Sequence, residues 1–279
     1  KKLPKLKVNI NKWIYFELLE TSNLIKKNIE DYRFDEAAKN AYHFAWHKYC
    51  DWYLELSKTI LFSDNLKAKN EVKEVSAFVF RQILIMLHPF IPFVTEKIWL
   101  TNKFDNKNKN FLMLSNWISG KSKKDSDHKQ VQQIIDIISE IRSFKNELNV
   151  SPGSFIDISI NSIKKNNQNF MINNEIIIKK LGRINNFFKK DQNKPAASLI
   201  ISGDLFKIYF DENVDLNAIK ENLLKRQNKY QEEMDKISQR LSNKGFVQRA
   251  PKDIVQQEKT NYSNLKNDIK KISLTIESL

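Results

Sequence analysis

A pair of apolar heptad repeats near the C-terminal end constrains this chain more than any other feature of its sequence. One repeat runs through 216–241 and the other through 255–279, with apolar residues at three- and four-residue steps along much of their length. Helices with this spacing bury the repeat by pairing along a seam. The seam positions are Leu216, Leu223, Tyr230, Met234, Ile237 and Leu241 in the first repeat, and Val255, Glu258, Tyr262, Leu265, Ile269, Ile272, Ile276 and Leu279 in the second.

The loop SNKGFVQRAP separates the two repeats. Gly245 can end a helix in the left-handed conformation, and Pro251 can begin the next one. We therefore predict an antiparallel coiled-coil hairpin over 216–279, with arms that reach about 40 Å at 1.5 Å per residue. Three basic residues lie at its tip: Lys244, Arg249 and Lys252.

Residues 1–120 are predicted to form a helical bundle. In 33–58 an apolar stripe follows the helical period, and a later helix is interrupted by HPFIP, where two prolines in four residues favour a corner between helices. His88 at this corner is interpreted as a capping or packing residue. The stripe consists of Phe34, Ala38, Ala41, Ala45, Tyr49, Trp52 and Leu56.

The middle section, 121–215, changes pattern. A helix over 131–148 is followed by FIDISI, which alternates with the period of a strand, and ASLIISGDLFKIYF predicts two strands joined by a tight turn at Gly203. A helix over about 170–181 lies between them. The chain is thus predicted to be mainly α, with a helical bundle, a small α+β domain and a coiled-coil hairpin.

Composition excludes several classes of function. The five glycines never fall into a GxGxxG or GxxxxGK pattern, so a glycine-rich nucleotide cradle is not expected. One cysteine, Cys50, allows no internal disulfide and suits a reducing, cytoplasmic compartment. No apolar run approaches the length of a membrane span. The chain starts without methionine, and we expect it to be a fragment.

The net charge of +14 is spread over the three sections. Basic and acidic residues number 19 and 13 in 1–120, 15 and 12 in 121–215, and 13 and 8 in 216–279. Several surfaces could therefore meet a polyanion such as a nucleic acid. The competing explanation is codon bias, because a composition rich in Lys, Asn and Ile can supply lysine without any ligand.

The sequence HFAWHKYC places His43, His47 and Cys50 at a spacing similar to that of zinc ligands. One straight helix separates positions 43 and 50 by about 10 Å, whereas ligands of one zinc lie about 2 Å from the metal. We therefore predict no metal site.

Taken together, these motifs resemble one family. YRFDEAAKNAYHFAWHKYCDWYLELSK and LHPFIPFVTEKIW resemble the helical anticodon-binding domain of class I aminoacyl-tRNA synthetases, and CDWYLELSK is close to its valyl form. IRSFKNELNVSP is similar to the next domain of the valyl enzymes, and LSNKGFVQRAPKDIVQQEK to the tip of their C-terminal coiled coil. The resemblance runs in order from about residue 9 to 279.

The resemblance implies a function in RNA recognition. The chain would be the C-terminal part of an ATP- and Mg-dependent valine–tRNA ligase, binding tRNA(Val) at the anticodon and outer corner as part of a monomeric enzyme. The family's HIGH-type and KMSKS-type signatures do not occur here, so this part would carry no catalytic residue and no cofactor. Its other partners would be the catalytic and editing domains of the same polypeptide. The first helix of the family's anticodon domain would precede residue 1.

Candidate RNA contacts follow from charge and aromaticity. Anticodon bases can stack on aromatic rings while basic groups hold phosphates. Core packing is the competing role for Trp13, and a solvated surface is the competing role for Arg142 and Lys145. The candidates are Lys12, Trp13, Arg33, Lys39, Arg142, Lys145, Lys244, Arg249 and Lys252. The alternatives to a ligase fragment are a non-enzymatic coiled-coil scaffold and a stand-alone tRNA-binding protein.

Overall fold

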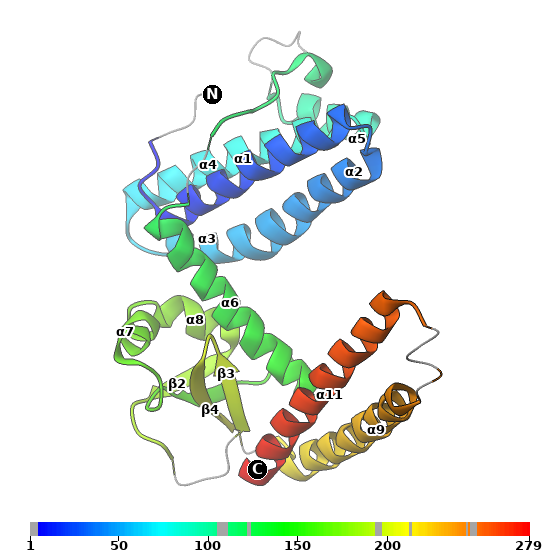
Figure 1. The fold of residues 1–279 in the computed structure, drawn as a ribbon. Helices are drawn as coiled ribbons and strands as arrows, with labels where there is room; N and C mark the ends of the chain where they lie inside the picture. The colour runs from blue at the N-terminus through cyan, green and yellow to red at the C-terminus, as the bar shows by residue number, and fades with distance from the viewer. Residues whose placement is uncertain are drawn as a thin grey trace. The chain divides into compact units, whose positions relative to one another are not determined.

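A computed structural model describes residues 5–104, 111–121, 124–192, 197–211, 214–243, 245 and 250–279. The chain divides into two compact units, Lys1–Asp136 and Ile137–Leu279, and the division falls inside helix α6 (Ser126–Glu147). Figure 1 shows helices throughout and a small sheet in the second unit. Among the described residues, no helix combines the length and apolarity that a membrane crossing requires.

The first unit is a bundle built around large apolar side chains. Trp13, Phe44 and Tyr53 are completely buried, and the Tyr53 hydroxyl donates to Asn11 Oδ1 at 2.7 Å. Burial of side chains this large is the main stabilising contribution to such a core. The bundle consists of α1 (Asn9–Glu30), α2 (Phe34–His43), the π-helix η1 (Phe44–Leu54), α3 (Glu55–Leu61), α4 (Leu66–Leu87) and α5 (Pro92–Thr101).

The π-helix η1 changes which residues of the predicted stripe are buried. A wider π turn inserts a five-residue step into the helical spacing, and such a step separates Phe44 from Tyr49. The expected stripe is therefore only partly correct: Phe34 is exposed, and Ala38, Ala45 and Trp52 are half-buried. The buried residues are Ala37, Ala41, Phe44, Tyr49, Tyr53 and Leu56.

The corner at HPFIP separates α4 from α5, as the prolines predict. Pro92 begins α5, where its missing N–H is harmless. His88 Nδ1 lies 2.8 Å from Thr95 Oγ1, and Thr95 is buried. His88 thus ties the end of one helix to the start of the next.

The second unit contains a four-stranded sheet in the order β2-β1-β4-β3. β1 pairs in parallel with β2 and antiparallel with β4, which pairs antiparallel with β3. Ser202 and Gly203 both have positive φ, as a two-residue hairpin turn requires. The elements are β1 (Ile156–Ser159), α7 (Lys165–Asn173), α8 (Glu175–Gly182), β2 (Ile184–Phe188), β3 (Ala197–Ile201) and β4 (Asp204–Phe210).

Strand β2 was not predicted. Its sequence, INNFF, places two asparagines side by side, so it lacks the alternation of polar and apolar residues that reveals a strand. It follows α8 directly and forms an edge of the sheet, where polar residues are tolerated. The predicted helix over 170–181 is observed as two helices, α7 and α8, that meet at Asn174.

The predicted hairpin is formed by α9 (Leu216–Ser242) and α11 (Lys252–Ser278), which pack along each other. Asp215 caps α9 by accepting from the amides of Asn217 and Ala218. At its base α11 contacts β3. The buried seam residues are Ile219, Leu223, Ile237, Val255, Ile272 and Thr275, so Ile219 rather than Leu216 begins the buried part of the seam.

Candidate nucleic-acid interface

The outer face of α2 and η1 carries two large aromatic rings in parallel. Tyr42 and Trp46 lie one turn apart, their planes differ by 3° and their centroids are 6.4 Å apart. They are 58% and 52% exposed, although each could pack in a core. A flat aromatic pair in solvent is a surface on which an unpaired base can stack.

The same helix explains why these rings stay outside. Ala41, Phe44 and Tyr49 turn inward, and the π turn keeps Tyr49 and Tyr53 in the core. Tyr42 and Trp46 are then left on the opposite side. Short π segments occur frequently at functional sites, and here the segment begins between the two exposed rings.

Two of the predicted basic residues lie on α2 or directly before it. Lys39 lies three residues before Tyr42, hence on the same helix face, and its exposed ammonium is 4.0 Å from Glu36. Arg33 precedes α2 and is flanked by Tyr32 and Phe34, two exposed rings whose centroids are 6.3 Å apart. We call Tyr32, Arg33, Phe34, Lys39, Tyr42 and Trp46 the α2 face.

His43 and His47 lie beside the aromatic pair with ring centroids 5.0 Å apart. His47 Nδ1 is 3.0 Å from Asp51 Oδ2, and partial burial together with His47 and Lys48 lowers the pKa of His43. Burial and Asp51 raise the pKa of Cys50. Within the described ranges no three possible metal ligands come together.

Two candidate contacts in α1 are engaged by other parts of the first unit. Trp13 is 0% exposed, which corrects the proposed base contact: its size and apolarity place it in the core instead. The ammonium of Lys12 forms an ion pair with Asp127, 2.5 Å from Oδ2, and this hydrogen bond raises the pKa of Lys12. Lys12 therefore joins α1 to the start of α6 rather than standing free for a phosphate.

Arg142 and Lys145 in α6 are held differently from each other. The exposed Arg142 donates from Nε and Nη2 to the carbonyl of Leu181, at 3.1 and 2.9 Å. Lys145 is only 2% exposed and donates to the carbonyl of Ser154. A solvated surface position is thus wrong for Lys145, because its side chain is buried beside the loop that precedes β1.

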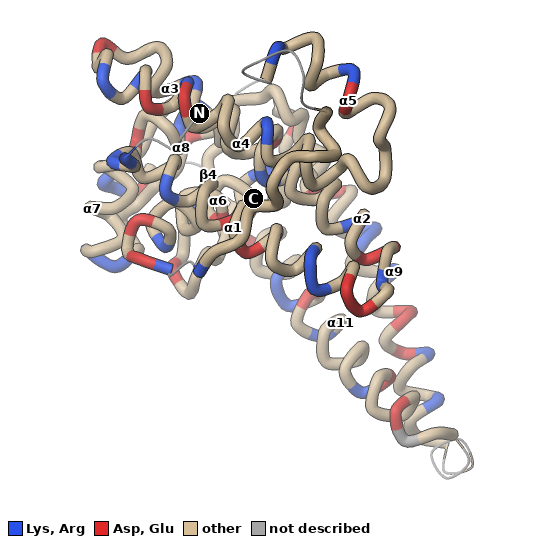
Figure 2. The backbone as a smooth tube through the Cα atoms, turned by 90° about the horizontal axis from the view of Figure 1, so that it is seen from above, with Lys and Arg blue, Asp and Glu red and all other residues tan. Residues whose placement is uncertain are grey.

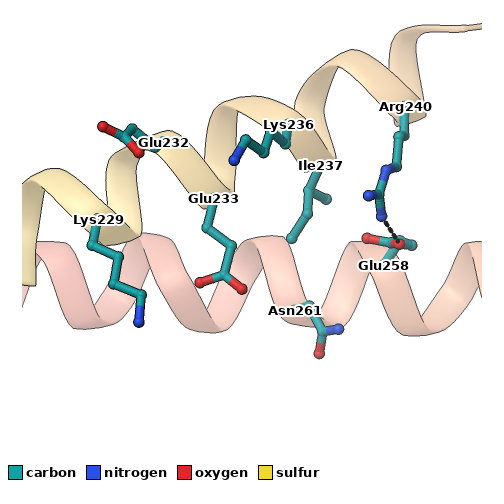
Figure 3. A pocket seen from close by; sticks show the side chains of 8 residues that line it. All are labelled: Lys229, Glu232, Glu233, Lys236, Ile237, Arg240, Glu258 and Asn261. Atoms are coloured by element: carbon teal, nitrogen blue, oxygen red, sulfur yellow. Dashed lines mark hydrogen bonds and ion pairs between the residues drawn. The ribbon is translucent and has the colours of Figure 1, made fainter.

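The hairpin of α9 and α11, called the arm from here on, carries both basic and acidic residues along its length. In Figure 2 basic and acidic positions alternate on α9 and α11. Figure 3 shows Arg240 reaching Glu258 across the two helices, with Nη1 3.0 Å from Oε1. This ion pair explains how the seam tolerates Glu258. It borders a cavity of about 430 Å³ lined by Lys229, Glu232, Glu233, Lys236, Ile237, Arg240, Glu258 and Asn261.

The tip of the arm lies largely outside the described residues. Lys244 and Arg249, together with the side chain of Lys252, lie outside the part of the chain that the structure describes. Their role as RNA contacts stays a prediction.

The exposed aromatic residues of the α2 face were missed in the sequence. A signal was present: Tyr42 and Trp46 fall off the apolar stripe, on the polar side of an amphipathic helix. Their spacing alone does not show that the rings are parallel, since that depends on the π turn.

Two protein families match the chain. Residues 11–160 match the anticodon-binding domain of tRNA ligase, and residues 215–279 match the valyl tRNA synthetase tRNA binding arm. A valine–tRNA ligase of Pelagibacter ubique is 70% identical over 99% of the chain, and one of Bartonella quintana is 32% identical over 100%. The chain covers 32% and 31% of these proteins, so it spans about a third of the length of the curated relatives it matches.

Proposed function

Since the anticodon-binding match covers more than half of its residues, the chain belongs to the family of tRNA-ligase anticodon-binding domains, and we propose that it is the tRNA-binding C-terminal region of a valine–tRNA ligase. It would bind tRNA(Val) at the anticodon through the first unit and at the outer corner through the arm. The carrying observation is the α2 face, which has a parallel pair of exposed rings and basic residues on the same helix or directly before it, in the segment that matches this family.

The chemistry of the α2 face fits a single-stranded loop. Unstacked bases gain about 1–3 kcal/mol each by stacking on an aromatic ring. Tyr42 and Trp46 would supply that surface, while Arg33 and Lys39 would hold the neighbouring phosphates. Sequence would then be read on the edges of the splayed bases.

The arm would contribute reach rather than sequence readout. Helices of 27 residues extend about 40 Å, which suits contact with a second region of a long RNA. Phosphate contacts from Lys244, Arg249 and Lys252 would add affinity independent of sequence.

The complete enzyme would perform ATP- and Mg-dependent aminoacylation with its catalytic domain, in the cytoplasm and as a monomer. The catalytic and editing domains would be partners within the same polypeptide. On this proposal the present chain positions the tRNA and takes no part in the chemical step.

The test is tRNA binding by the 279-residue chain. A tRNA(Val) transcript should bind with a strong dependence on salt, and a transcript with altered anticodon bases should bind more weakly. The double variant Tyr42→Ala, Trp46→Ala should lose roughly 5- to 150-fold in affinity, corresponding to about 1–3 kcal/mol.

Phe93→Ala is the matched control, because Phe93 is an exposed ring of the same unit (91% exposed) on another helix. It should bind as the wild type does. Equal affinities for the wild type and the double variant would remove the α2 face from the interface. Amino-acid activation by the chain alone, measured as ATP–pyrophosphate exchange with valine, would contradict the non-catalytic role.

A further inference from the structure

Three cationic side chains converge on one cavity where α6 meets α8. The cavity has a volume of about 360 Å³ and is lined by Arg142, Lys145 and Arg183, together with Asn146, Pro152, Leu181 and Gly182. None of these lining residues is acidic. A concave site lined by basic groups favours an anion.

Each cation is fixed by the fold. The guanidinium of Arg142 is anchored on the Leu181 carbonyl, and the ammonium of Lys145 on the Ser154 carbonyl. The guanidinium of Arg183 lies over the ring of Phe155, 5.6 Å from its centroid. Two carbonyls and a ring thus help to orient the three basic groups.

The direction in which the pKa of the buried Lys145 is shifted agrees with a positive potential in the cavity. Burial lowers the pKa of Lys145, and the nearby Arg183 and Arg142 lower it further. Like charges held together in a partly desolvated place oppose one another, and a bound anion would relieve that repulsion.

Arg183 also occupies an unusual backbone position. It follows α8 with φ of 55°, in the left-handed region where glycine is favoured. Its carbonyl accepts from the amide of Ile156, so the backbone is tied to β1. Strained positions of this kind occur preferentially at functional sites, and here the strained residue carries the charge.

We propose that this cavity binds a phosphate group of the RNA backbone, held by Arg142 and Arg183 above the ammonium of Lys145. Arginine guanidinium groups bind phosphate through two parallel hydrogen bonds. The contact would be independent of base sequence and would give the second unit an RNA contact besides that of the arm. It rests on the proposed function, because the ligand is the same tRNA.

The decisive variant is Arg183→Gly. Glycine relieves the left-handed strain while it removes the charge, so the variant should fold with an unchanged or higher Tm. We expect tRNA(Val) affinity to fall roughly tenfold and the salt slope to decrease by about one unit. Lys103→Gly is the matched control: Lys103 also has positive φ, at 51°, and is exposed, but it does not line the cavity.

A second measurement distinguishes a phosphate of the RNA backbone from free phosphate. Inorganic phosphate alone, added at constant ionic strength, should raise the Tm of the wild type and of Lys103→Gly but not of Arg183→Gly. If the phosphate effect is lost in Arg183→Gly while its tRNA affinity is unchanged, the site takes free phosphate and the RNA contact is overturned.

The remaining outcomes are also decisive. If the wild type binds tRNA and both glycine variants behave alike in both assays, the cavity is no anion site, although the proposed function stands. If the wild type binds no tRNA, the proposed function and the RNA contact fail together, and the phosphate assay then reports only on the cavity.

Discussion

The bundle of the first unit and the arm of the second are both helical, yet they shield their apolar side chains from solvent to very different extents. Helices α1 and α4 have 22 residues, and α9 and α11 have 27. In the bundle several helices surround each core ring, so Trp13, Phe44 and Tyr53 are fully shielded from solvent. In the arm two helices cover only one stripe of each other, and most seam residues stay half-exposed.

If the proposed function is right, this difference would correspond to two ways of binding an RNA. A base-stacking surface must hold its rings in place, which requires a rigid core directly beneath them. An arm that meets only phosphates needs reach and charge, and it tolerates local opening. The bundle and the arm have helices of similar length. They differ in how many neighbouring helices cover each helix.

The largest effect on stability is expected from a substitution that creates a cavity in the bundle core. Phe44→Ala removes a fully buried ring at the start of the π-helix, which should cost about 3–5 kcal/mol in the free energy of unfolding. Urea unfolding followed by circular dichroism measures the loss. Phe93→Ala, at a 91% exposed position, should change stability by about 0.5 kcal/mol or less. A small effect of Phe44→Ala would mean that the bundle is no more firmly packed than the arm.

The second-largest effect on stability is expected from a charge placed in the seam of the arm. Ile272→Asp places a charge in the buried seam and should destabilise the α9–α11 pair by about 2–4 kcal/mol. Ile254→Asp is the matched control because Ile254 lies on the same helix and is 43% exposed. Hydrogen exchange should show faster exchange in both arm helices with the bundle unchanged. Loss of protection in the bundle as well would show that the two regions do not unfold separately.

Sequence patterns predicted the elements whose periodicity is simple. The heptads predicted both arm helices, and the prolines of HPFIP predicted the corner between α4 and α5. The errors came where an inserted or polar residue interrupts the period. The five-residue step from Phe44 to Tyr49 shifted the core stripe, and Asn185 with Asn186 concealed β2.

The candidate site was harder to predict because exposure is a property of packing. The sequence shows that Trp13 and Trp46 are both aromatic residues in helices, but not that one is buried and the other half-exposed. Arg183 was missed because its side chain is placed by its own left-handed backbone conformation between α8 and β2, which no sequence pattern indicates. The division into domains 1–120, 121–215 and 216–279 stays a prediction beside the two compact units observed.

A third effect concerns RNA binding by the arm. Reversing Lys244 and Arg249 to Glu should weaken tRNA binding and flatten the salt slope by about one unit for each phosphate that the tip no longer binds. Discrimination at the anticodon should not change, because the α2 face is intact. Reversal of Lys266 and Lys270, exposed on the stem of α11, changes the net charge equally and serves as the control. If both reversals weaken binding alike, the effect is one of overall charge and the tip has no specific contact.

The smallest effect should come from the charged position of the arm seam, Glu258. Arg240 and Glu258 pair across the two helices at 3.0 Å, with 59% of the Arg240 side chain and 17% of the Glu258 side chain exposed. Arg240→Ala should cost about 0.2–1 kcal/mol of arm stability, the range of partly exposed pairs, and 1 M salt should remove most of the difference. The exchanged variant Arg240→Glu, Glu258→Arg restores the pair with its charges swapped and should recover the stability. A destabilisation that persists at high salt and in the exchanged variant would assign the contribution to the packing of the Arg240 stem against the seam. The arm would then resemble the bundle in relying on apolar packing even where its seam carries a charged residue.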